Sequence, residues 1–191
     1  MKRLIIYILF IILIDSCSSE QGVSIDKIKV EALEDKNYFF YNSKKYSGRI
    51  YGKDNKMLTL EFNVLNGLYH GLYQEFYENG FIKKEINYNK GVLQGYERTF
   101  FKNGKLSESI NYNDGNFHGV RNVYWENGML KETNSFSNGI LVGKSNYFFP
   151  NGKLRKKIEF DSNGKKNGVW EEYDSKGKLI EEIVFENGIK K

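Results

Sequence analysis

Glycine recurs along most of this chain at a nearly constant interval. Gly67 and Gly91 are 24 residues apart, and the spacing continues with a single extra residue before Gly164. The glycines at this interval are Gly67, Gly91, Gly115, Gly139, Gly164 and Gly188. Each of the first five is followed by a second glycine four residues later and by a third glycine nine residues after the second. A fixed period predicts repeats that each pack on their neighbours. We therefore predict five copies over residues 67–191, preceded by a degenerate copy and an N-terminal hairpin over residues 38–66.

Each copy contains two candidate strands. In one copy they read "YERTFF" and "KLSESINY", joined by "KNG". Asn-Gly between β-favouring runs is a strong hairpin signal, and aromatic residues make up 16% of the chain. The sequence predicts an all-β fold: a single-layer, twisted antiparallel β-meander of about six 24-residue β-hairpin repeats, preceded by a signal peptide.

The loop length follows from two unbroken columns. Phe100 recurs in every copy as Phe or Tyr, and Leu106 as Leu or Ile. A three-residue Lys-Asn-Gly loop puts Phe100 opposite Leu106, whereas a two-residue loop sends the columns to opposite faces. The three-residue loop is predicted, with turn glycines in the left-handed conformation. These are Gly80, Gly104, Gly128, Gly152 and Gly177.

Continuing this register predicts further rows on the same face. The second apolar row would place one set of residues, Leu72, Tyr96, Val120 and Val169, opposite another, Ile86, Ile110, Asn134 and Ile183. A polar row between the first two apolar rows would pair Arg98 with Glu108. A third apolar row near the connections would consist of Tyr88, Tyr112, Phe136, Phe160 and Phe185. No helix-forming segment is left to cover that face, so we expect curvature and stacking of neighbouring repeats to bury it.

An aromatic stripe is predicted on the other face, beside the turns. It consists of Tyr77, Phe101, Trp125 and Phe149, adjoined by Val123 and Tyr147 and ending at Asp174. If that face is exposed, the stripe is a candidate binding site, because exposed apolar patches and aromatic anchors mark interfaces. The alternative is that curvature partly buries both faces and the stripe stiffens the hairpin tips.

The N-terminus has the pattern of an export signal. Lys2 and Arg3 precede the apolar run Leu4–Ile14, which is shorter than the ~20 residues of a membrane-spanning helix. "IDSC" resembles a bacterial lipoprotein signal, although Asp15 is unlike the residue usual there. We predict a signal peptide over residues 1–16, lipidation at Cys17, a linker over residues 17–37, and anchoring to a bacterial cell or outer membrane. The alternative is an ordinary signal peptide with a stray cysteine.

No residues suggest catalysis, a metal or a cofactor. His70 and His118 occupy one repeat position two copies apart, about 19 Å in a flat sheet. The net charge of +5, from 29 basic and 24 acidic residues, contains no basic block of the kind that nucleic-acid binding favours. We expect neither an enzyme nor a nucleic-acid or small-molecule substrate.

The repeat itself resembles a known family. "GNFHGVRNVYWENGMLKETNSFSNG", Gly115 to Gly139, resembles a MORN-variant repeat in its Gly-x-x-His-Gly start and Tyr-x-x-Asn-Gly-x-Leu core. Bacterial chains with this form are similar to the YwqK-type antitoxins of toxin–antitoxin systems. The resemblance implies an extended β-meander that mediates protein contacts, without a catalytic residue.

Two functions remain open from the sequence. The first is a non-enzymatic, lipid-anchored scaffold of the cell envelope that binds a protein on the stripe or at an edge strand. The resemblance adds an antitoxin- or immunity-like role, with a toxin as partner. The alternative is an envelope protein whose stripe, around Trp125, binds carbohydrate or lipid headgroups.

Overall fold

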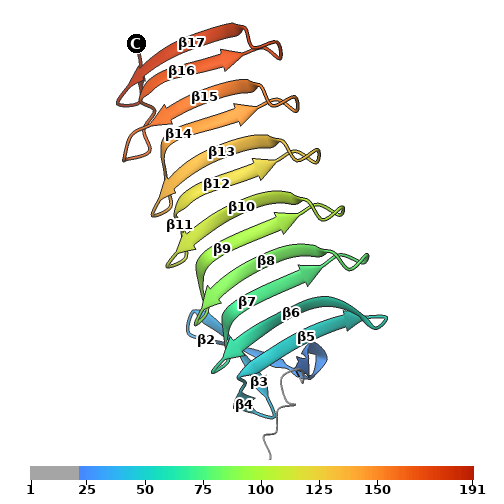
Figure 1. The fold of residues 1–191 in the computed structure, drawn as a ribbon. Coiled ribbons are helices and arrows are strands. Elements are labelled where there is room, and N and C mark those ends of the chain that lie inside the picture. The colour runs from blue at the N-terminus through green and yellow to red at the C-terminus, as the bar shows by residue number, and fades with distance from the viewer. Residues whose placement is uncertain (1–21) are drawn as a thin grey trace, which may run out of the picture.

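The computed structural model describes residues 22–191, and strands dominate it. A long sheet runs through the molecule, with a small three-stranded sheet at its N-terminal end (Figure 1). The long sheet consists of β1 (Val23–Ser24), β5 (Gly48–Asp54), β6 (Met57–Leu65), β7 (Leu68–Phe76), β8 (Ile82–Asn89), β9 (Val92–Phe100), β10 (Leu106–Asn113), β11 (Asn116–Phe117), β12 (Gly119–Tyr124), β13 (Leu130–Ser137), β14 (Ile140–Phe148), β15 (Leu154–Phe160), β16 (Gly168–Tyr173), β17 (Leu179–Glu186) and β18 (Ile189–Lys190).

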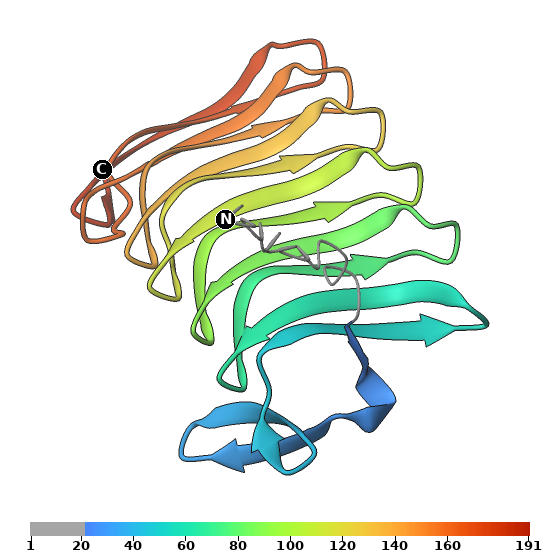
Figure 2. The same ribbon diagram turned by 60° about the horizontal axis from the view of Figure 1, so that its bottom comes forward.

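Strand order follows the chain from β5 onward, and neighbouring strands pair antiparallel. Among the described residues, the two-residue strand β11 pairs only with β10, which also pairs with β12. The two-residue strand β1 runs parallel to β5 at the N-terminal edge. Figures 1 and 2 show one twisted layer, with hairpin tips along one edge and repeat connections along the other. The predicted all-β, single-layer meander of hairpin repeats is confirmed.

The hairpin tips have the predicted three-residue loop. Phe100 pairs with Leu106, and the Phe101 amide donates to the Lys105 carbonyl at 2.8 Å. Gly104 has φ +81°, where a side chain would be strained, and the other four turn glycines also have positive φ. The turn therefore requires glycine because of its backbone conformation.

Hydrogen bonds between turns join consecutive repeats along both edges. At the connections, the Gly91 amide donates to the Tyr69 carbonyl at 2.7 Å, and the Gly115 amide to the Leu93 carbonyl at 2.9 Å. At the tips, the Asn79 side-chain amide donates to the Lys102 carbonyl at 2.8 Å. The 24-residue period thus brings equivalent turns side by side.

A β-bulge in each hairpin changes the predicted faces. After the Phe100–Leu106 pair, Thr99 lies opposite Glu108, so Ser107 is an extra residue. The register shifts by one, and because strand side chains alternate, Ile110 lies on the face opposite to Leu106. We call the two sides the leucine face, with Phe100 and Leu106, and the isoleucine face, with Ile86 and Ile110.

The predicted second apolar row is therefore divided between the two faces. Its members on the first strand of each hairpin share the leucine face as predicted (Leu72, Tyr96, Val120 and Val169), whereas those on the second strand lie on the isoleucine face (Ile86, Ile110, Asn134 and Ile183). Ile86 pairs with Tyr73 rather than Leu72, and Arg98 pairs with Ser109 rather than Glu108. The third row lies on the isoleucine face as well: Tyr88 opposite Gly71, Tyr112 opposite Gly95, Phe136 opposite Gly119, Phe160 opposite Gly143 and Phe185 opposite Gly168. The predicted register has a glycine bulge in the turn but continues uniformly beyond it, whereas the strand contains a second bulge at Ser107.

The buried residues of the long sheet lie on the isoleucine face. Ile50, Phe62, Ile86 and Ile110 are 0–6% exposed, and each belongs to a different strand. Burying such a side chain stabilises a protein by about 1.5–3 kcal/mol. The core is thus one row across the strands, covered by neighbouring side chains because the sheet has a single layer.

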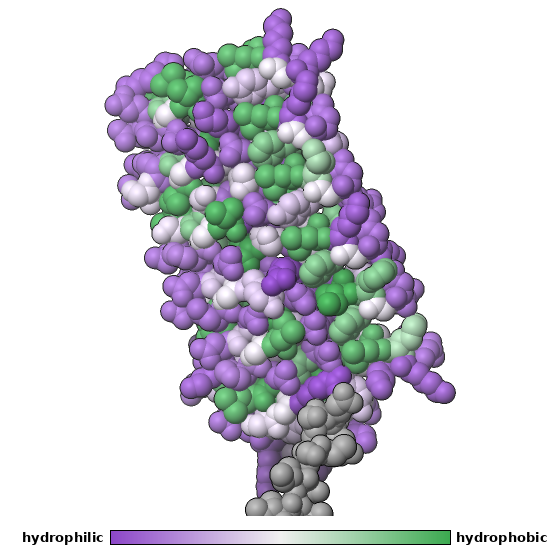
Figure 3. All heavy atoms as spheres, viewed as in Figure 1, coloured by the Kyte–Doolittle hydropathy of each residue, from purple (hydrophilic) through white to green (hydrophobic). Residues whose placement is uncertain are grey.

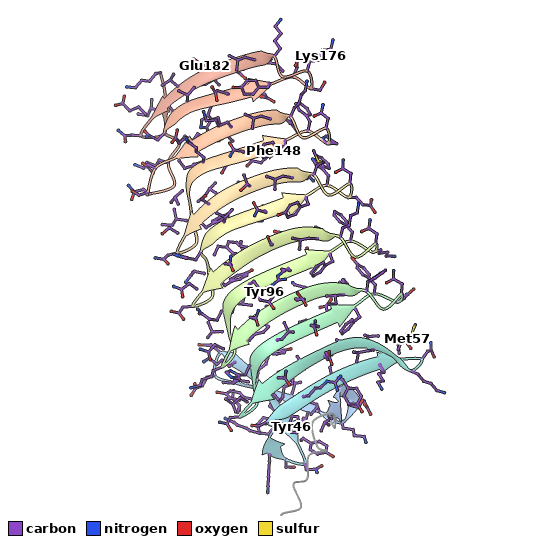
Figure 4. All side chains as sticks on the ribbon, in the orientation of Figure 1. Tyr46, Met57, Tyr96, Phe148, Lys176 and Glu182 are labelled. Carbon is purple, nitrogen blue, oxygen red and sulfur yellow. The ribbon has the colours of Figure 1, made fainter. Side chains whose placement is uncertain are left out.

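The leucine face carries a more exposed apolar set. Tyr96 and Phe148, labelled in Figure 4, belong to it and are half-buried. In the same orientation, Figure 3 shows apolar side chains over the strands and mostly polar ones along the edge of hairpin tips. Hydrophilic side chains line the connection edge as well, so the apolar side chains lie mainly between the two edges in this view.

The small sheet packs against the first repeat. It consists of β2 (Lys29–Leu33), β3 (Lys36–Tyr41) and β4 (Lys44–Lys45), after the short 3₁₀ helix η1 (Ile25–Lys27). Phe39 of β3 is 5% exposed and contacts Phe62 and Tyr69 with ring centroids 5.2 and 4.8 Å away. The segment predicted as a linker thus contains β1, η1 and β2 where the structure describes it. The predicted signal peptide and Cys17 lie outside the described residues.

Candidate functional site

The aromatic stripe lies at the hairpin tips, one residue beyond a strand in each repeat. Tyr77, Phe101, Trp125 and Phe149 are half-buried, and their amides bond across the turn. Every second side chain of a strand points to the same face, and Tyr73, which pairs with Ile86, is on the isoleucine face. Tyr77 lies four residues further on, so the stripe shares this face with the core. The stripe lies on the face opposite to Phe100 and Leu106, as predicted, but the prediction that the other apolar rows face away from it was wrong. A strand bulge beyond each turn brings the buried row onto the face of the stripe.

Two stripe residues hydrogen-bond to the next repeat. The Tyr77 hydroxyl donates to the Phe100 carbonyl at 2.7 Å, and the Trp125 indole N–H donates to the Phe148 carbonyl at 3.3 Å. Such a bond contributes about 0.5–1.5 kcal/mol. These residues therefore join the hairpin tips while part of each side chain remains exposed.

The residues predicted beside the stripe occupy the same face. Val123 pairs with Glu132 and Tyr147 with Lys156, one step further from the tips. Asp174 takes the stripe position in the last repeat, but its carboxylate accepts the amide of Lys176 at 2.8 Å. Four aromatic residues form the stripe, and a turn-capping carboxylate ends it.

Basic side chains accompany the stripe, which the sequence prediction missed. The Lys131 ammonium lies 4.6 Å from the centroid of the Trp125 ring. A surface cavity of about 340 Å³ at Tyr77 is also lined by Lys83 and Lys102. The signal was present in the sequence: a Lys or Arg follows three of the four aromatic residues after six positions, as Lys83, Lys131 and Arg155.

Further along the isoleucine face, charged groups occur in paired networks. The Glu97 carboxylate accepts the Lys84 ammonium at 2.8 Å and the Tyr112 hydroxyl at 2.9 Å. Burial, followed by the hydrogen bond to Glu97, raises the pKa of Tyr112 well above its ordinary value. Arg121 bonds Glu108 at 2.6 Å and Glu132 at 2.9 Å. The Lys84–Glu97 and Arg121–Glu108 contacts link neighbouring repeats, and the other two lie within one hairpin.

A family comparison matches five segments, each one hairpin and its connection. The matched segments are residues 69–90, 93–114, 117–138, 141–162 and 166–187, described as the MORN repeat variant, and together they cover more than half of the chain. The chain belongs to the MORN repeat variant family. A search of curated proteins finds no match. As a MORN repeat protein, the chain is a repeat-based binding module.

The MORN repeats place the two histidines at their connection edge. The His70 Nδ1 atom is buried without a hydrogen-bond partner, and the exposed His118 lies between β11 and β12. Among residues 22–191, no three His, Cys, Asp or Glu side chains form a group that could hold a metal ion. Over the same residues, the structure contains no helix with the length and apolar character of a membrane span.

Proposed function

We propose that this MORN repeat protein is a non-enzymatic scaffold that binds another protein through the aromatic stripe. The supporting observation is the row of Tyr77, Phe101, Trp125 and Phe149, half-exposed on four consecutive tips. Aromatic residues are favoured at the centres of protein interfaces. Because the repeats are bonded at both edges, the four side chains form a pre-arranged surface that costs little ordering on binding.

The proposed site of action is the bacterial cell envelope, with the protein exported and anchored by lipid at Cys17. The lipoprotein-like "IDSC" and the single cysteine support this proposal. Lipid attachment with two or more chains gives stable anchoring, whereas one chain is marginal. Cys17→Ala should move the protein out of the detergent phase or leave it uncleaved. Unchanged mass and partitioning would contradict lipidation.

Within this proposal, the resemblance to YwqK-type antitoxins supports an antitoxin- or immunity-like role with a toxin as partner. The alternative is binding of carbohydrate or lipid headgroups. Trp125 favours this alternative, because a half-exposed indole beside the Lys131 ammonium can stack on a sugar ring or lie at a headgroup. Neither role requires a cofactor or a reacting group.

The alternation of strand residues provides matched positions for a test. Phe148 and Phe149 are consecutive and half-buried, but only Phe149 belongs to the stripe; Phe100 and Phe101 form an equivalent pair. The photo-crosslinker p-benzoylphenylalanine would replace each residue in turn in the full-length protein in its native envelope. Adducts would be identified by mass spectrometry.

We expect one defined protein adduct from positions 101 and 149 and none from positions 100 and 148. An adduct confined to positions 100 and 148 would place the interface on the leucine face and overturn the proposed site. Glycan or lipid adducts at positions 101 and 149 would support the alternative function. Retained thermal unfolding of all four variants is the control for folding.

A further inference from the structure

The hairpin tips contain the chain's whole excess of positive charge. The segments 77–83, 101–107, 125–131, 149–155 and 174–180 together hold 8 basic and 3 acidic residues, a net charge of +5. The full chain has 29 basic and 24 acidic residues, so 21 of each remain elsewhere and cancel. The fold collects cations that are dispersed in the sequence onto one edge of the sheet.

These cations are exposed and largely free of carboxylate partners. Among the described residues 22–191, one tip cation has a carboxylate within 4.0 Å: the Lys83 Nζ atom lies 3.1 Å from the Glu75 carboxylate. The other seven are Lys102, Lys105, Lys131, Lys153, Arg155, Lys176 and Lys178. Lys131 lies over the Trp125 ring, and Lys83 and Lys102 share a cavity with Tyr77, so these three cations flank the stripe directly.

The spacing of the stripe adds a geometric constraint. One repeat contributes two strands, so successive stripe residues are about 9.6 Å apart for strands ~4.8 Å apart. A polyproline II helix has three residues per turn and rises ~9.3 Å per turn, so every third side chain recurs on the same side at about that spacing. In a β-strand, by contrast, every third side chain points to the opposite face. A polyproline II segment that crosses the strands could therefore place one side chain at each aromatic residue of the stripe.

We propose that the stripe binds an acidic segment of a protein partner in the polyproline II conformation, with an apolar side chain at every third position and carboxylates between them. The proposal rests on the proposed function and specifies the partner's chemistry. The apolar side chains would contact Phe101, Trp125 and Phe149, and the carboxylates would pair with the tip cations. Charge complementarity favours an acidic segment. The Tyr77 and Trp125 donors already bond backbone carbonyls, which leaves their exposed ring surface for apolar contacts.

A set of synthetic peptides tests this partner chemistry. The probe is a fluorescent peptide long enough to span four stripe residues, with Leu at every third position and Asp or Glu between. One control peptide has the same composition with the Leu residues clustered at one end, and another has Lys in place of the acidic residues. We expect the first peptide to bind the mature protein in a salt-dependent manner and the controls to bind about tenfold more weakly or worse.

Charge reversals test the binding face. Lys102→Glu combined with Lys131→Glu should weaken binding of the first peptide about tenfold or more, because both tip cations become like charges. The matched control is Lys90→Glu with Lys165→Glu, two exposed lysines of the connection edge, which should leave binding unchanged. Equal binding of all peptides, or equal loss in both variants, would overturn the proposal.

The proposal can fail separately from the proposed function. A protein crosslinked at positions 101 and 149, together with no binding of the acidic peptide, would retain the protein-binding site and reject this partner chemistry. Binding of phosphatidylglycerol vesicles with the same dependence on Lys102 and Lys131, and no peptide binding, would assign the edge to a membrane surface and overturn the inference.

Discussion

Trp125 and Phe148 are joined by a hydrogen bond of 3.3 Å from the indole N–H to the backbone carbonyl, although they are 23 residues apart in the chain. The two belong to adjacent repeats, because one period separates their tips. A residue first considered for binding therefore also stabilises the sheet. This double role explains why binding and folding must be measured separately at the stripe.

The hydrogen bond itself can be tested by removing the donor and retaining an aromatic ring. Trp125→Phe should lower the free energy of unfolding by about 1 kcal/mol, measured by denaturant titration. Trp170→Phe is the matched control, since the buried Trp170 Nε1 atom has no partner. It should cost less, because no hydrogen bond is lost. A larger loss at Trp170 than at Trp125 would contradict this assignment.

Gly104 tests the loop conformation. Its φ of +81° places a Cβ in a strained region, while the nearest atom to that Cβ, Phe81 Cδ1, is at an acceptable 3.4 Å. Gly104→Ala should therefore destabilise by about 1–2 kcal/mol through the backbone alone. Gly104→Asn should recover part of this, since Asn tolerates left-handed φ better. Equal stability of wild type and Gly104→Ala would argue against the strained turn.

The buried pair Asn134 and Ser145 departs from the otherwise largely apolar core row. They are 3% and 0% exposed, and the Asn134 side-chain amide donates to the Ser145 hydroxyl at 2.9 Å. Ser145→Ala should cost about 1–3 kcal/mol, because a buried amide loses its acceptor. The control is Ser109→Ala on the leucine face, which is half-buried. Chemical denaturation should separate the two, and identical small effects would contradict the role of the pair.

Tyr69 gives the fold a dependence on alkaline pH. Burial, and then the neighbouring Tyr88, raises the pKa of Tyr69 to about 12, from an ordinary value of 10.0. The unfolded chain loses this proton first, so stability is complete below pH 10 and falls as pH rises towards 12. Tyr69→Phe should reduce this fall in thermal unfolding experiments. In the wild type, ultraviolet absorbance should show several tyrosines ionising late, and the Tyr69→Phe variant should show one fewer, because burial raises the pKa of Tyr69 and of Tyr112.

The predictable part of the structure came from local signals repeated many times. The 24-residue glycine period, the Asn-Gly turns and the Phe100 and Leu106 columns were sufficient for the hairpins, their loop length and the single-layer meander. Each signal depends on a few neighbouring residues, and repetition made each conclusion secure. The four stripe residues were also named from the sequence, since they occupy one position in successive copies.

The tertiary structure decided which side chains share a face and which charges gather. One unpaired residue per hairpin, such as Ser107, shifts the register and places Ile110 on the same face as the stripe. The residues at this bulge, Thr99, Ser107 and Glu108, are polar and do not by themselves specify that the strand bulges there. Likewise, Lys102 and Lys131 are far apart in sequence, and stacking of the repeats brings their tips to the same edge. The period alone could determine the hairpins because they form locally, but faces and charge clusters depend on pairing between strands.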